Sequence, residues 1–168
     1  MLTRRSLAAA IAAVWLPLLC GAHPARAGEA DNKATGKVVY KGNTVAIRYA
    51  YLVRGPDAVD PKKVIRRLVL SPTDMEGKIR SCPEMSCSDG SVREGMTVDF
   101  DSGPRLNYWV VMKDQRVQYS GTAKPESFTA RADGAGKLGG RLSIDDGTAG
   151  GAVVDVDFDA MLVKEFSK

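Results

Sequence analysis

Two cysteines five positions apart are the most specific chemical feature of the chain. They bound the segment Cys82-Pro83-Glu84-Met85-Ser86-Cys87. In an oxidising compartment such a pair forms a disulfide that closes a short loop. The alternative is a soft-metal site, in which Cys82, Met85 and Cys87 bind Cu(I) through thiolate and thioether sulfur. We favour the disulfide, because cleavage of an export signal would remove the third cysteine, Cys20, and leave this pair alone.

Three carboxylates alternate with apolar residues near the end of the chain, at Asp155, Asp157 and Asp159. Neighbours in such a row lie about 7 Å apart on a strand, too far for one Ca²⁺ to bind all three without a bend. A glycosidase would need a second carboxylate across a groove, and the sequence shows none. We therefore expect a solvated outer face, which also discourages edge-to-edge pairing.

A glycine-rich segment, Gly134-Ala135-Gly136-Lys137-Leu138-Gly139, matches the letters of a dinucleotide-binding loop. That motif binds a pyrophosphate only when a helix begins at its last glycine. Here the following residues, Arg141-Leu142-Ser143-Ile144, have strand character. We interpret the glycines as a hairpin turn.

Two further features are candidates for partner binding. Trp109 lies on the more polar face of a predicted strand, near Arg48 or Arg54 if the second strand is its neighbour. It would be an aromatic platform for a protein, sugar or peptide, although we favour packing beneath residues 72–95. The second feature is a basic cluster, either a solvated strand and loop or a docking site for an acidic partner, and it comprises Lys62, Lys63, Arg66 and Arg67.

The first 27 residues have the three parts of a secretory signal peptide. Arg4 and Arg5 form the basic region, residues 7–19 the apolar run, and Ala25-Arg26-Ala27 the cleavage site. The run is too short to span a bilayer comfortably. The paired arginines fit both the general secretory and the twin-arginine routes. We expect a periplasmic or secreted protein with no membrane span in its mature form.

Cleavage after Ala27 would change the chemistry available to the chain. Three of its 24 basic residues and none of its 20 acidic residues lie in residues 1–27, so the formal net charge falls from +4 to +1. That charge predicts no nucleic-acid binding. The single histidine, His23, is removed as well. Without imidazole there is no Ser-His-Asp or Cys-His nucleophile and no histidine-ligated zinc or copper.

The remaining chain has the period of β-strands. Residues 28–35 have no apolar period and predict a flexible leader, and residues 36–168 are enough for a single β domain. Alternation predicts buried faces on two long strands, with Val45, Ile47, Tyr49, Tyr51 and Val53 on one and Val154, Val156, Phe158, Ala160 and Leu162 on the other.

A hairpin around residues 113–116 is the centre of the predicted sheet. Its expected core face comprises Leu106, Tyr108, Val110, Met112, Val117 and Tyr119. Residues 62–70 favour a strand, while residues 72–95 predict a long irregular excursion, and no helix is expected. Many short strands between Gly, Pro and Asp turns predict an all-β fold. We favour a single antiparallel β-sandwich of about eight strands, with an up-and-down β-barrel as the alternative.

Three short segments carry a resemblance. They are Tyr49-Ala50-Tyr51, Asp60-Pro61-Lys62-Lys63 and Val69-Leu70-Ser71-Pro72, and they follow an export signal. Together they resemble small exported β domains of Gram-negative bacteria that have no assigned activity. The resemblance implies an exported β domain and assigns no catalytic residue.

These observations predict a non-enzymatic binding or accessory domain of the periplasm that requires no cofactor. Its partner would be an envelope protein or a small ligand. The alternative is a soft-metal (copper) or small-ligand carrier of the cell envelope, using Cys82, Met85 and Cys87 or a cavity inside the sheet.

Overall fold

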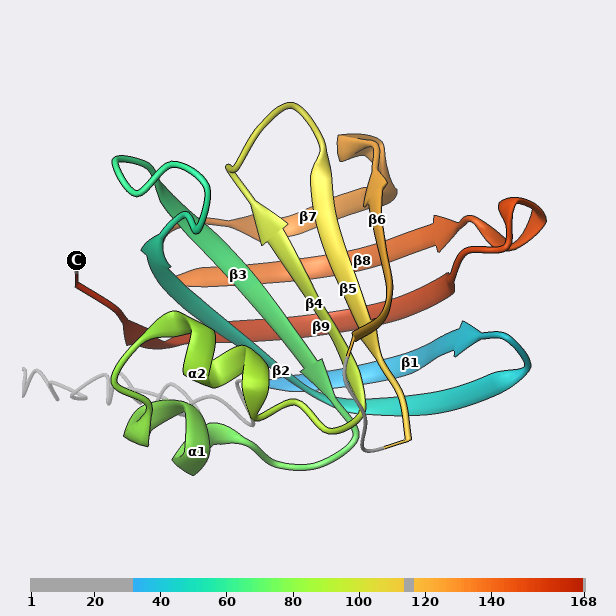
Figure 1. Ribbon diagram of the computed structural model, residues 1–168, viewed down its shortest axis with the longest axis horizontal. Helices are drawn as coiled ribbons and strands as arrows, with labels where there is room; N and C mark the ends of the chain where they lie inside the picture. The colour runs from blue at the N-terminus through green and yellow to red at the C-terminus, as the bar shows by residue number, and fades with distance from the viewer. Residues whose placement is uncertain (1–31, 114–116, 168) are drawn as a thin grey trace, which may run out of the picture.

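A computed structural model describes residues 32–113 and 117–167. The predicted signal peptide and residues 28–31 of the predicted leader lie outside these residues. Within them the chain forms one antiparallel sheet with the order β6-β5-β4-β3-β2-β1-β9-β8-β7 (Figure 1). Two meanders, β1 to β6 and β7 to β9, are joined because β1 pairs with both β2 and β9.

The strands of the described part are β1 (Lys33–Tyr40), β2 (Asn43–Pro56), β3 (Val64–Ser71), β4 (Gly95–Phe100), β5 (Leu106–Val111), β6 (Val117–Ala123), β7 (Phe128–Asp133), β8 (Lys137–Asp145) and β9 (Val153–Glu165). Two α-helices, α1 (Glu76–Ser81) and α2 (Met85–Gly90), lie between β3 and β4. Short 3-10 turns follow β6 (Pro125–Ser127) and β8 (Gly147–Ala149).

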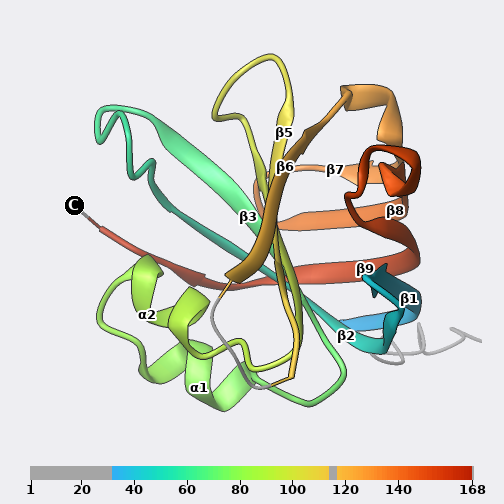
Figure 2. The same ribbon diagram turned by 45° about the vertical axis from the view of Figure 1, so that its right-hand side comes forward.

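The sheet curls on itself like half of a barrel. Figure 2 shows β3, β5 and β6 on one side and β7 and β8 on the other, with β9, β1 and β2 below them. The all-β prediction is confirmed. A sandwich of eight strands is not confirmed, because the β1–β9 pairing merges the two meanders that a sandwich would hold in separate sheets.

The main core fills the inside of the curl. Along β9 the predicted alternation is confirmed, with Val154, Val156 and Phe158 buried and Asp155 exposed. In the central hairpin Leu106, Tyr108, Val110 and Met112 are buried as predicted, and Val110 pairs with Tyr119.

The prediction of the hairpin core face is wrong for one residue, Val117. A register shift after Val110 pairs Val111 with Val117, so Val117 leaves the core face and is 52% exposed. A single extra residue in one strand reverses the facing of every residue beyond it, and alternation alone does not reveal where that happens.

A second apolar core lies under the helices, on the outer face of β2 and β3. Its members include Tyr51, Ile65, Val69, Met75, Ile79 and Phe166. Strand β2 contributes to both cores, since Val45 and Ile47 face the main core whereas Tyr51 and Val53 face the second. The predicted single face for residues 45–53 is therefore wrong. The pairing of β1 with β2 is also irregular here, between Lys33 and Gly36.

The excursion between β3 and β4 contains two helices, so the expectation of an irregular segment without helix is wrong. Each helix is six residues long, too short for the apolar period to appear in the sequence. Tertiary contacts hold α1: Ile79 is fully buried, and the Tyr51 hydroxyl donates to Asp74 at 2.7 Å and accepts from the Met75 amide at 2.9 Å. No helix of the described residues is long and apolar enough to cross a membrane.

Strand β1 begins at Lys33, within the segment predicted to be a flexible leader. Its central glycine, Gly36, has a φ of 146°, and a Cβ atom there would overlap the backbone oxygen of Asp155 on β9. This glycine therefore permits the close approach of the two strands that join the meanders.

We expect Gly36→Ala to lower the free energy of unfolding by at least about 2 kcal/mol, because it combines a strained φ with a backbone clash. Gly77→Ala is the matched control: a Cβ at Gly77 meets nothing within 4 Å, so that variant should be neutral or slightly stabilised. Urea denaturation of the two variants measures both values. Equal stability would show that the β1–β9 approach tolerates a side chain.

Candidate ligand pocket

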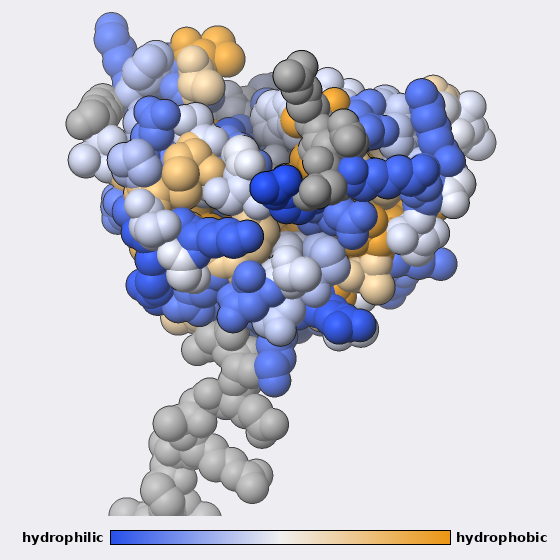
Figure 3. Space-filling view, turned by 60° about the horizontal axis from the view of Figure 1, so that its bottom comes forward, coloured by the Kyte–Doolittle hydropathy of each residue, from blue (hydrophilic) through white to orange (hydrophobic). Residues whose placement is uncertain are grey.

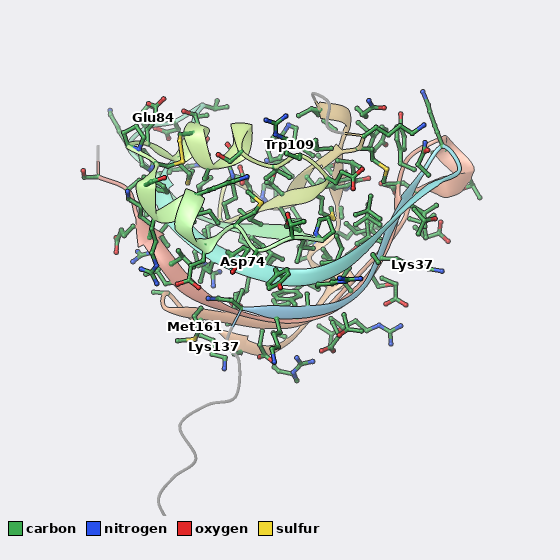
Figure 4. All side chains as sticks on the ribbon, turned by 90° about the horizontal axis from the view of Figure 1, so that it is seen from below. Lys37, Asp74, Glu84, Trp109, Lys137 and Met161 are labelled. Atoms are coloured by element: carbon green, nitrogen blue, oxygen red, sulfur yellow. A yellow bond between two sulfur atoms is a disulfide. The ribbon has the colours of Figure 1, made fainter. Side chains whose placement is uncertain are left out.

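A pocket of about 490 Å³ opens between α2 and the outer face of β3, β4 and β5. The α2 segment with its N-cap, the β2–β3 loop and five strands line it, through Pro56, Asp57, Ala58, Pro61, Arg67, Glu84, Met85, Ser86, Asp89, Thr97, Trp109, Val111 and Val117. Figure 4 shows Glu84 and Trp109 on the side of the sheet that carries the helices, with Lys137 and Met161 on the opposite side.

A buried ion pair forms the floor of the pocket. Arg67 on β3 donates through Nε and Nη2 to both carboxylate oxygens of Asp99 on β4, and the Nη2–Oδ2 distance is 2.7 Å. The two residues are 7% and 4% exposed. Burial lowers the pKa of Arg67, but the hydrogen bond to Asp99 and the surrounding carboxylate charges outweigh burial and raise it overall. The guanidinium therefore stays charged, and Asp99 compensates that charge.

Arg67 also holds α2 in place, because its Nη1 donates to the carboxylate of Asp89 on that helix. The other oxygen of Asp89, Oδ1, is buried and has no hydrogen-bond partner among the described residues. Burial raises the pKa of Asp89 to about 6; the charge of Arg67 opposes this shift and that of Asp99 adds to it. Asp89 is therefore a carboxylate whose charge is only partly compensated.

The walls of the pocket are mostly apolar. The half-buried Trp109 side chain stands beside the floor, with its ring centroid 5.6 Å from the guanidinium carbon of Arg67, within the range of a cation–π contact. Val111, Val117 and Met85 extend the apolar surface. Trp109 thus lines an open pocket beside α2 and is not part of the second core, in contrast to the packing beneath residues 72–95 that the sequence favours.

The neighbourhood predicted for Trp109 is wrong in one respect. Strands β3 and β4 lie between β2 and β5, so Arg48 and Arg54 are not on an adjacent strand. The arginine that contacts Trp109 is Arg67. Arg48 is exposed on β2.

The four residues of the basic cluster do not form one surface. Arg66 and Arg67 point to opposite faces of β3, and Arg66 binds Asp101 and Asp133. Lys63 donates to the carbonyl of Ser102 at 3.3 Å, and Lys62 is exposed. Carboxylates within the domain therefore compensate the charge of the two arginines.

Cys82 and Cys87 form the predicted disulfide, which connects the end of α1 to the middle of α2. Their sulfur atoms are bonded to each other, so Cys82, Met85 and Cys87 do not present the thiolates of a copper site. Met85 packs into the second core. Within residues 32–113 and 117–167, no three His, Cys, Asp or Glu side chains are grouped to hold a metal ion.

The other two candidate motifs lie away from the pocket. Asp155, Asp157 and Asp159 are on the outer face of β9 and pair with arginines of β7 and β8, namely Arg131 and Arg141. The glycine-rich segment forms the turn between β7 and β8 and the start of β8, with no helix after it, as predicted.

Charged side chains are spread over much of the surface. Figure 3 shows hydrophilic residues around small apolar patches on the face seen from below. Comparison with protein families, with curated proteins and with solved structures finds no match to this chain.

Sequence patterns indicated Trp109, Arg67 and Met85 for separate reasons, but not as neighbours. The pocket carboxylates Asp57, Glu84 and Asp89 were missed. Asp57 follows β2 in a loop and Asp89 lies within α2, so only the tertiary fold brings them together. The one local signal was the Asp89-Gly90 pair, which resembles an ordinary turn.

Arg67→Met should lower the free energy of unfolding by about 3–5 kcal/mol, because it leaves Asp99 buried without its partner. Arg66→Met is the matched control on the same strand. Its partner Asp101 is 42% exposed, so the expected loss is about 1 kcal/mol or less. Guanidinium denaturation distinguishes the two, and similar losses would contradict the central role of the Arg67–Asp99 pair.

Asp89 should make stability depend on pH. Its pKa in the folded protein, about 6, lies above the ordinary value of 3.8, so the folded state binds this proton more tightly. The Asp89 contribution to the free energy of unfolding therefore increases as pH falls from about 7 to about 5. The difference between wild type and Asp89→Asn, measured by urea denaturation at both pH values, should grow in favour of wild type at the lower pH. A difference independent of pH would refute the shift.

Proposed function

We propose that this chain is an exported, non-enzymatic binding domain of the cell envelope that holds a small ligand, or a small group of a partner, in the Trp109 pocket. The observation that carries the proposal is the position of Trp109, which is half-buried in the wall of an open pocket. A large aromatic side chain in this position offers apolar area to a ligand at little cost in side-chain entropy.

The size and the lining of the pocket support this proposal. A volume of about 490 Å³ is in the range of sites for small molecules, which are mostly apolar with a few polar groups. Trp109 and Val111 come from a strand, and α2 is fixed by the disulfide and by the Arg67–Asp89 contact. A site built on such elements loses little entropy when it binds.

The chemistry of the pocket favours binding over catalysis. The floor arginine is engaged by Asp99, and the chain that would remain after residue 27 has no histidine. Export is supported by the sequence of residues 1–27 and by the disulfide, which suits an oxidising compartment. A small-ligand carrier would use the same pocket, whereas a copper carrier loses its ligands to the disulfide.

The test is native mass spectrometry of the protein purified from the periplasm, comparing wild type with Trp109→Ala. We expect wild type to retain a small molecule and Trp109→Ala to lose it while remaining folded. Met161→Ala is the control, because Met161 is a partly buried apolar residue on the opposite side of the molecule (Figure 4). Retention of the same ligand by Trp109→Ala would rule out this pocket as its site.

A further inference from the structure

We propose that the pocket recognises a ligand with a protonated amine on an alkyl chain. This inference rests on the proposed function and names the chemical class of the ligand. Three observations carry it. The first is the set of charges that line the pocket, and the second is the apolar wall beside them. The third is that Arg67, the only cation among the described lining residues, is already paired with Asp99.

The pocket has an excess of negative charge. Asp57 lines it from the β2–β3 loop, Glu84 from the N-cap of α2, and Asp89 from near the end of that helix. The only cation among the described lining residues is Arg67, and Asp99 beneath it compensates that charge. The lining from β4, β5 and β6 carries no charged side chain. Three carboxylates therefore act on any ligand that enters.

Negative charges in a partly enclosed site repel an anion and concentrate a cation, because low-dielectric walls focus their electric field. A carboxylate or phosphate ligand would need a free cation, and the guanidinium of Arg67 already donates to both oxygens of Asp99. A neutral ligand would leave the partly compensated charge of Asp89 unchanged. An ammonium group is the ligand charge that offsets it.

The apolar wall determines the rest of the ligand. Trp109, Val111 and Val117 lie along one side, and Pro56 and Met85 along another. Such surfaces stabilise methylene groups by roughly 0.8 kcal/mol for each group buried. The face of an indole ring also attracts an ammonium group. An alkylamine combines these two chemistries.

The experiment uses three six-carbon probes that differ only in their head group: hexylamine, hexanol and hexanoate. The signal-free protein has a single tryptophan, so the fluorescence of Trp109 reports binding directly. At about pH 7.5 we expect hexylamine to bind at least tenfold more tightly than hexanol, and hexanoate to bind most weakly. A further arm uses Nα-acetyl-lysine methylamide. If this probe binds more tightly than hexylamine, the recognised amine belongs to a lysine side chain of a partner. If it binds more weakly, the recognised ligand is a free alkylamine.

Two charge variants make the test specific. Glu84→Gln should weaken the binding of hexylamine about fivefold, which is the effect of one unit charge near 4 Å in water. The affinity for hexanol should not change. Glu126→Gln is the control, because Glu126 is exposed on the turn after β6 and does not line the pocket. Acidification through about pH 6 should also weaken the binding of hexylamine, because protonation of Asp89 removes one of the three negative charges of the lining. The charged groups that act on Asp89 are Arg67 and Asp99, and Asp57 and Glu84 are the other carboxylates of the pocket.

Two results would overturn the inference. If hexanol or hexanoate binds as tightly as hexylamine, the pocket does not select an amine, although it still binds a ligand. If no probe changes Trp109 fluorescence at millimolar concentration, the proposed recognition of an alkylamine is also wrong. The proposed function fails separately, when Trp109→Ala retains the ligand found by mass spectrometry.

Discussion

The contact on which the described site depends is the buried ion pair between Arg67 and Asp99. It joins β3 to β4 on the outer face of the sheet, and the third donor of Arg67 reaches α2 through Asp89. A charge in this position is costly to bury, so the guanidinium of Arg67 needs the hydrogen bonds that the carboxylates of Asp99 and Asp89 accept. The same guanidinium lies beside Trp109. One side chain therefore sets the floor of the pocket, the position of its helix and the environment of its aromatic wall.

The curled sheet provides the frame for this arrangement. The β1–β9 pairing makes one sheet from two meanders, and the Tyr108 hydroxyl donates to Asp146 in the segment between β8 and β9. With the main core inside the curl, the outer face of β3, β4 and β5 is available to α2 and to the pocket. The disulfide then limits the conformations open to the short helical segment, which has few internal hydrogen bonds.

Local patterns predicted the parts of the fold that depend on local chemistry. Alternation identified the buried face of β9, and the hairpin pairing of Val110 with Tyr119 followed from its loop. The same alternation is compatible with a sandwich and with one curled sheet, because strand order is decided by long-range pairing such as Lys37 with Asp155. The helices escaped prediction because six residues show no period. The pocket carboxylates escaped because an aspartate in a loop or turn looks the same whether or not it faces a cavity.

The central claim is that ligands bind beside Trp109 and α2. The most direct measurement is an NMR titration of the signal-free protein with a small-molecule extract of the periplasm, because its single indole N–H gives one resolved signal. The account predicts that this signal shifts together with backbone amides of α2 and of the β2–β3 loop. Shifts confined to β7, β8 and β9, with the Trp109 signal unchanged, would contradict it.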